Sequence, residues 1–207
     1  MTSAEGCMRI QTHGITVVAL STAFLCTGLH AQDGVRSRTG YWLGFGMGYG
    51  AGWFSCTGCP SATARYGVTA LVRAGARLSP RLRVGGELNV WTRHSTQSGS
   101  GLTQASGNAS ATIYYSPSPS PSRSLFLKGG MGLAFGRFQS TIGGKSSATG
   151  FGAVVGVGYD VRAGSHVALT PTINLLSGLD GDQSGGLGSN LTHVIVDIGV
   201  GITIHEN

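Results

Sequence analysis

Two cysteines separated by two residues form the most closely spaced reactive pair in the chain. Cys56 and Cys59 stand in the sequence Cys-Thr-Gly-Cys, a spacing that also occurs in redox-active dithiols and in half of a zinc site. A zinc site needs two more ligands, and there is no second such pair and no histidine between Ser55 and Arg65. We therefore predict a loop disulfide between Cys56 and Cys59, with no metal and no cofactor.

Two histidines, His94 and His193, stand beside serine-rich segments. A histidine next to a serine can activate the hydroxyl for acyl transfer, which is the chemistry of lipid-modifying enzymes. Spacing fixes no acid partner for either histidine, although Asp180 and Asp182 are available, and serine is frequent throughout these segments. We therefore predict that the chain is not an enzyme and keep lipid modification as an alternative.

A third set of residues is charged and alternates with apolar neighbours. Its members are Arg73, Arg77, Arg83, Glu87, Lys128, Asp160, Arg162 and Asp197. A tight hairpin turn after Leu78 would place Arg73 opposite Glu87 and Arg77 opposite Arg83, and the second, like-charged pair requires an anion such as Asp160. Because buried charges are costly unless they are paired, we interpret the set as a salt-bridge network that fills an interior. A gated pathway for small solutes is the alternative interpretation.

The composition restricts the elements that can position these residues. Glycine accounts for 36 of 207 residues and charged residues for only 11%, against typical shares of about 7% and about 25%. The hydrophobic fraction of 41% argues against a disordered polar chain. The charge is too sparse for a coiled coil or an ordinary soluble helical domain.

Most of the chain alternates between apolar and small or polar residues with a period of two, which predicts β-strands. The alternating stretches are Gly40–Phe54, Tyr66–Leu78, Leu82–Trp91, Asn108–Tyr115, Leu125–Phe138, Gly150–Val161, Val167–Leu175 and His193–His205. Connections of three to nine residues, such as 79–81, 116–124 and 163–165, alternate with longer polar segments, namely 55–65, 92–107, 139–149 and 177–192. Short turns on one side and long loops on the other are typical of outer-membrane barrels.

The two faces of these stretches differ in the way that a transmembrane barrel requires. One face is apolar without interruption, as a lipid-facing surface is, and the other is mainly glycine, alanine and threonine, which fit a narrow lumen. Aromatic residues near strand ends predict the girdle of such a barrel: Tyr41, Trp53, Tyr66, Tyr115 and Tyr159. We predict an all-β fold, an eight-stranded antiparallel up-and-down transmembrane β-barrel, because strands in lipid must close to pair every backbone group.

The N-terminal segment reads as a targeting signal. Residues 14–31 are apolar and end in small residues, and Arg9 precedes them. We predict a signal peptide at 1–31, an N-terminal periplasmic segment at 32–39 and the barrel domain at 40–207. Translation from Met8 in place of Met1 is an alternative.

Four segments carry a resemblance to a known family. The order SPRLRVGGELNVW, YYSPSPSPSRSLFLKGGMGLAFGRF, GVGYDVRAGSHVALTP and VDIGVGITI resembles the small eight-stranded outer-membrane barrels of the OmpA/OmpX type, from Gly40 onward. The resemblance implies a location in the bacterial outer membrane. It implies as partners the outer-membrane lipids and lipopolysaccharide and the barrel assembly machinery, and an extracellular surface partner is also expected.

These observations predict a barrel with a filled lumen that acts in envelope structure or in surface interaction through its extracellular loops. The alternative function is passage of small solutes, apolar ones among them, through the barrel. The net charge of +6 would suit nucleic acid, but much of it is expected inside the barrel or at the periplasmic turns, so we predict no nucleic-acid partner.

Overall fold

The computed structural model describes residues 40–57, 63–97, 100–120, 122–140, 144–181 and 189–206. The predicted signal peptide, the segment 32–39 and Cys59 lie outside the described residues. Within the described part of the chain, no helix is long and apolar enough to cross a membrane.

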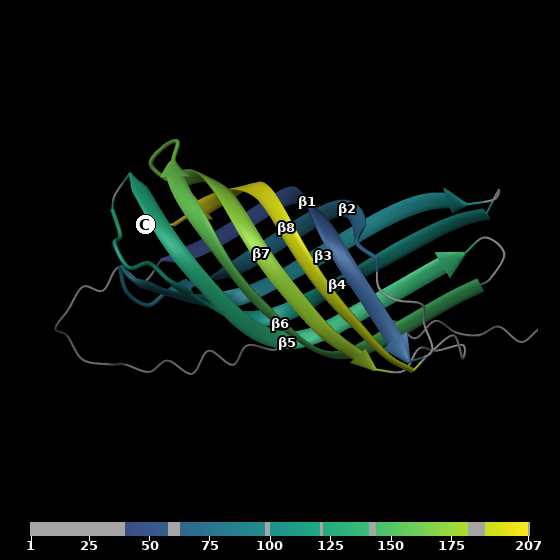
Figure 1. The fold of residues 1–207 in the computed structure, drawn as a ribbon. Coiled ribbons are helices and arrows are strands. Elements are labelled where there is room, and N and C mark those ends of the chain that lie inside the picture. The colour runs from purple at the N-terminus through teal and green to yellow at the C-terminus, as the bar shows by residue number, and fades with distance from the viewer. Residues whose placement is uncertain are drawn as a thin grey trace, which may run out of the picture. The chain divides into compact units, whose positions relative to one another are not determined.

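The described residues form eight strands that follow one another along the chain (Figure 1). They are β1 (Tyr41–Thr57), β2 (Arg65–Arg77), β3 (Leu82–Gln97), β4 (Ser100–Tyr115), β5 (Arg123–Ser140), β6 (Gly144–Arg162), β7 (Val167–Gly181) and β8 (Ser189–His205). Each strand pairs with its sequence neighbours, and β1 pairs with β8, so that the sheet is a closed barrel. All these pairings are antiparallel, which confirms the predicted fold class.

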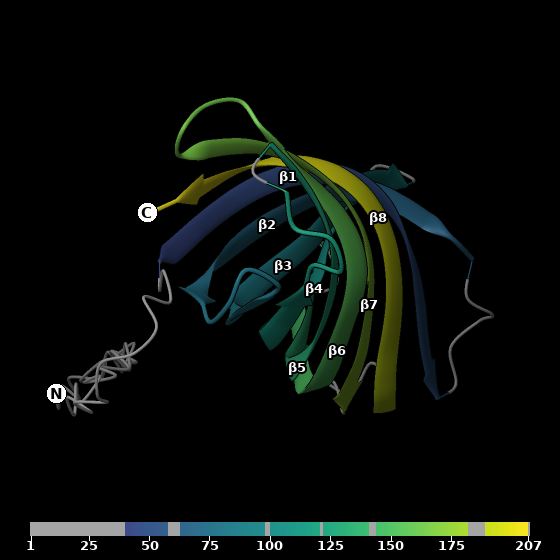
Figure 2. The same cartoon turned by 90° about the vertical axis from the view of Figure 1, so that its left-hand side faces the viewer.

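The two ends of the barrel differ, and we name them by the chain termini. At the terminal end lie Gly40 and Glu206, the ends of β2, β4 and β6 and the starts of β3, β5 and β7. At the distal end β1, β3, β5 and β7 end and β2, β4, β6 and β8 begin. Figure 2 shows the strands curving around one interior.

The prediction of long loops at the distal end is wrong for much of 92–107 and 139–149, which form paired strands. Residues 92–107 were expected as a loop, but β3 and β4 stay paired from Val90 opposite Gly107 to Gln97 opposite Ser100. The hairpin of β5 and β6 likewise continues to Ser140 opposite Gly144. Backbone pairing needs no apolar side chains once the strands have left the lipid layer, so the serine- and threonine-rich segments extend the sheet.

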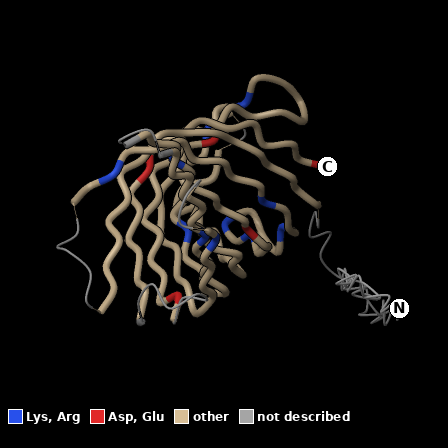
Figure 3. Tube along the Cα trace, turned by 90° about the vertical axis from the view of Figure 1, so that its right-hand side faces the viewer, with Lys and Arg blue, Asp and Glu red and all other residues tan. Residues whose placement is uncertain are grey.

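The outward face is a continuous apolar belt. Large apolar side chains on it are exposed by between 37% and 71%, and charged residues are sparse along the strands (Figure 3). In β7 the burial alternates at every residue, with Leu169, Ile173 and Leu175 outward and Thr170, Thr172 and Asn174 inward. This arrangement inverts that of a soluble protein and matches a lipid-facing wall.

Glycines allow the closing strands β1 and β8 to approach closely. Gly46 pairs with Gly201 and Gly48 with Gly199, and a Cβ atom at Gly46 would meet the backbone carbonyl of Val200 at 2.9 Å. The absence of side chains therefore permits the sharp curvature that closes a narrow barrel.

Candidate functional site in the barrel interior

A buried carboxylate organises the terminal half of the interior. Glu87 of β3 forms an ion pair with Lys128 of β5, and both side chains are inaccessible to solvent. The Tyr114 hydroxyl donates to Glu87 at 2.5 Å and the Asn89 amide donates to it at 2.7 Å. Both carboxylate oxygens thus accept hydrogen bonds, as a buried charge requires.

A second ion pair lies nearer the terminal end. Arg83 of β3 contacts Asp160 of β6 at 3.1 Å, and the Thr170 hydroxyl donates to the same aspartate at 2.8 Å. The hydroxyls of Thr170 and Thr203 lie 2.8 Å apart, and Arg73 donates to Thr203 at 2.8 Å. These contacts connect five of the eight strands through side chains that point inward.

Three buried aromatic rings pack between these charges. Trp42 and Tyr114 meet edge to face with ring centroids 4.9 Å apart, and Tyr114 meets Phe126 at 5.7 Å. The guanidinium carbons of Arg73 and Arg83 lie 5.2 Å and 4.9 Å from the Phe126 centroid, within the range of cation–π attraction. We call the set formed by these rings and the neighbouring charges the interior cluster: Trp42, Arg73, Arg83, Glu87, Tyr114, Phe126, Lys128 and Asp160.

The hairpin of β2 and β3 has the predicted register, but the residues that lie opposite each other in it do not form the ion pairs. Arg73 lies opposite Glu87 and Arg77 opposite Arg83. Glu87 nevertheless pairs with Lys128, and Arg73 lies over the aromatic rings. An arginine on β2 and a glutamate on β3 point into the same lumen, where side chains from non-adjacent strands also compete for the carboxylate.

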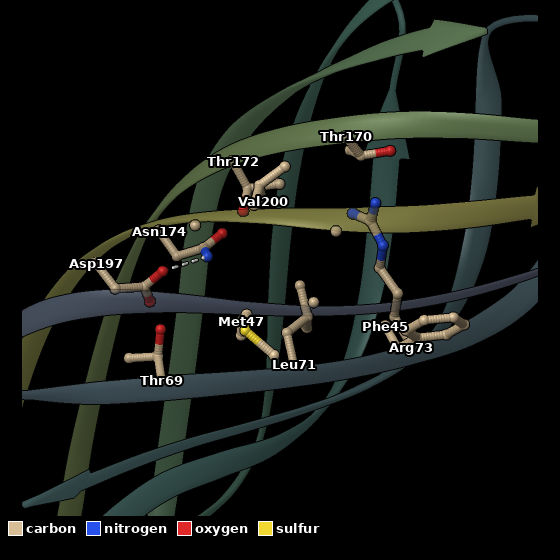
Figure 4. A pocket seen from close by; sticks show the side chains of 13 residues that line it. Phe45, Met47, Thr69, Leu71, Arg73, Thr170, Thr172, Asn174, Asp197 and Val200 are labelled. Carbon is tan, nitrogen blue, oxygen red and sulfur yellow. Dashed lines mark hydrogen bonds between the residues drawn. The ribbon is translucent and has the colours of Figure 1, made fainter. Parts of the chain in front are cut away.

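Among the described residues, the other charged members of the predicted set form no ion pair with the interior cluster. Asp197 accepts a hydrogen bond from Asn174 at 2.9 Å (Figure 4). Arg162 donates to the backbone oxygen of Ser165 at 3.3 Å in a turn of the terminal end. Among the described residues, neither Arg77 nor Arg162 takes part in an ion pair.

A polar cluster in the distal half contains one of the histidines from the sequence analysis. Nδ1 of His193 lies 2.7 Å from Asp180, and Nε2 lies 3.2 Å from Oδ1 of Asn108. The Asn108 amide donates to the carbonyls of Ala153 and Ser177, which fixes its oxygen toward the histidine. The two ring nitrogens therefore face the oxygens of Asp180 and Asn108, which hold the ring in one orientation. Sequence analysis missed Asn108 as a partner because Asn108 and His193 lie far apart in the sequence and on the non-adjacent strands β4 and β8.

The predicted girdle aromatics and His94 lie at the surface of the barrel. The girdle aromatics are all outward and exposed; Tyr41, Tyr115 and Tyr159 lie toward the terminal end, and Trp53 and Tyr66 toward the distal end. His94 is exposed and lies 3.0 Å from the Thr103 hydroxyl.

Of the two cysteines in the predicted loop disulfide, the structure describes only Cys56. Cys56 is disulfide-bonded, while Cys59 lies outside the described residues. Within the described residues, no three His, Cys, Asp or Glu side chains are grouped to hold a metal.

Two cavities lie between the described strands. A space of about 10 Å³ lies beside Arg73, Thr170 and Asp197 where β1, β2, β7 and β8 meet (Figure 4). That volume suits a single water molecule. A larger cavity of about 130 Å³ lies in the distal half, lined by Arg65, Arg93 and Gln104 among others.

Comparison with known proteins identifies the family. The model of the outer membrane protein beta-barrel domain matches residues 17–202. Neisserial surface protein A shares 16% identity with a TM-score of 0.55, covering 79% of this chain and 96% of that one. Ail, the attachment invasion locus protein of Yersinia pestis, solved in complex with the heparin analogue sucrose octasulfate, shares 13% identity with a TM-score of 0.50, covering 80% and 99%. No curated protein matches. Because the family model matches residues 17–202, the chain belongs to the outer membrane β-barrel family, and its location is the bacterial outer membrane.

Proposed function

We propose that this chain is a non-enzymatic outer-membrane protein whose lumen is closed to solutes and whose distal end acts in envelope structure or in contact with a surface partner. The observation that carries the proposal is the interior cluster. Its rings and charges come from β1 to β6 and are each at most 6% exposed. A lumen filled by paired charges and packed rings leaves no continuous aqueous path.

The distal end is the part that this proposal assigns to the outside of the cell. An even number of strands places both termini on one side, and such barrels have their short turns and termini in the periplasm. The hairpins of β3–β4 and β5–β6 stay paired through serine- and threonine-rich residues at the distal end, to Gln97 opposite Ser100 and to Ser140 opposite Gly144. Two proteins of similar fold carry names that refer to the surface or to attachment, which supports a surface role. The proposed partners are outer-membrane lipids around the belt, lipopolysaccharide at the distal rim, and the assembly machinery during insertion.

Solute passage is the alternative, and the packing disfavours it. Lys128 and Glu87 bind each other in the terminal half of the lumen, and two arginines lie over the Phe126 ring. Opening a pathway would require this buried ion pair to separate and the packed rings to move.

The arrangement around His193 supports the absence of catalysis. In acyl-transfer sites, the ring nitrogen opposite the carboxylate faces a hydroxyl nucleophile. Here that nitrogen faces the amide oxygen of Asn108, and the ring itself is buried. His94 contacts Thr103 on the outward face and takes part in none of the ion pairs among the described residues.

Planar-bilayer recording tests the closed lumen. Purified protein inserted in a bilayer is expected to carry no steady current, because the interior cluster fills the section of the lumen that ions would cross. Proteoliposomes from the same preparation, examined by gel electrophoresis before and after boiling, verify that the folded barrel is inserted. A steady current that scales with the amount of inserted protein would overturn the proposal and favour solute passage.

A further inference from the structure

The distal half of the barrel contains a cavity lined almost entirely by hydrogen-bond donors. It measures about 130 Å³ and is lined by Arg65 of β2, Arg93 and Ser95 of β3, and Leu102 and Gln104 of β4. These strands are neighbours, so the five side chains come from one sector of the wall. The volume approaches the roughly 150 Å³ of a cavity that binds benzene, so a small polyatomic ion fits in it.

One hydrogen bond fixes the direction of the buried amide. Arg65 donates from Nη1 to Oε1 of Gln104 at 3.0 Å, so the amide oxygen is occupied by a cation. The nitrogen of the same amide is buried and has no hydrogen-bond partner, although Gln104 is only 2% exposed. A buried N–H donor without an acceptor is costly, and a ligand that supplies the acceptor removes that cost.

The charges around the cavity have the same sign. Within the described residues no carboxylate lines the cavity, and neither Arg65 nor Arg93 belongs to an ion pair. The described carboxylate in the distal half, Asp180, is bound to His193. Two guanidinium groups beside an unfilled space thus create a positive potential that no described side chain neutralises.

We propose that this cavity is a binding site for one tetrahedral oxyanion, phosphate or sulfate, either free or as the terminal group of a sugar. Guanidinium groups bind such oxygens through paired N–H donors, and the Gln104 amide and the Ser95 hydroxyl complete a set of donors. The cavity has room for the anionic group of such a ligand. This site is additional to the proposed function and does not require the lumen to be closed or open.

Isothermal titration of the purified, folded barrel tests the site, with inorganic phosphate, inorganic sulfate and glucose 6-phosphate as probes. Arg65→Gln and Arg93→Gln each remove one charge-assisted contact and are expected to weaken binding at least about tenfold. Arg137→Gln is the matched control, because Arg137 is an exposed arginine on the outward face of β5 toward the same end. It is expected to change the affinity less than about twofold.

The three probes distinguish a free anion from a sugar-borne group, and the variants distinguish loss of the site from loss of folding. Binding of inorganic phosphate or sulfate that depends on Arg65 supports a free anion, and binding of glucose 6-phosphate alone supports a sugar-borne group. Gln104→Leu removes the orphan donor without changing the charge and is expected to weaken binding as well. Gel mobility before and after boiling confirms that each variant is folded. Absence of saturable binding by all three probes, or equal loss in Arg137→Gln, would overturn this site while leaving the bilayer test of the lumen unaffected.

Discussion

Replacing Glu87 by alanine is expected to destabilise the folded barrel by about 3–5 kcal/mol, because the substitution leaves Lys128 as an unpaired buried charge. The hydroxyl of Tyr114 and the amide of Asn89 lose their acceptor in the same step. Urea unfolding of the refolded protein in detergent, followed by gel mobility and far-ultraviolet circular dichroism, measures the loss.

A double variant separates the charge from the packing. Glu87→Leu combined with Lys128→Met replaces the ion pair by apolar side chains of similar size, and such replacements are often neutral. We expect the double variant to recover most of the stability that either single variant loses. The interpretation fails if the Glu87→Ala variant is as stable as the natural chain, or if the double variant is no more stable than Lys128→Met alone.

Replacing Gly158 by valine is expected to destabilise the barrel by about 3 kcal/mol through overpacking. Gly158 points inward on β6, and the Phe126 ring lies so close above it that an added Cβ would overlap the ring atoms. The ring would have to leave its position between Tyr114 and the two arginines, losing an aromatic pair and two cation–π contacts. The same urea titration measures the effect.

A glycine on the neighbouring strand provides the control. Gly129 lies on the outward face of β5, and a Cβ atom there would meet nothing within 4 Å. Gly129→Val is therefore expected to change the stability by less than about 0.5 kcal/mol, or to increase it slightly, since valine suits a strand that faces lipid. Equal losses in Gly158→Val and Gly129→Val would show that strand glycines matter through their backbone alone, and the role given to Phe126 would be wrong.

Alternation of side chains predicted the architecture because it reports directly which face meets lipid. Each of the eight alternating stretches became a strand, and the neighbour-to-neighbour pairing followed from the short connections. The same signal failed at the distal end, where both faces of β3 and β4 are polar. There the pairing of Gln97 with Ser100 depends on the backbone ladder, and no apolar period marks it.

The interior contacts were predictable only within a hairpin. Spacing placed Arg73 opposite Glu87, yet the ion pairs join β3 to β5 and β3 to β6 across the lumen. Which inward residues meet across a barrel depends on the tilt and stagger of all the strands together, which one sequence does not state. Gln104 was missed because residues 92–107 were expected to form a loop, although the Gln104 side chain is buried. Asn108 was missed because its partner His193 lies on a non-adjacent strand.

Heat-modifiability tests the central claim most directly, namely that the apolar faces meet lipid and the strands close into a stable barrel. The protein is extracted from isolated outer membranes and run on a denaturing gel with and without boiling. A closed barrel has no unpaired strand edge and resists detergent, so the unheated protein is expected to migrate differently from the boiled protein. Identical migration of the two samples, with the protein recovered in the soluble fraction, would contradict the account.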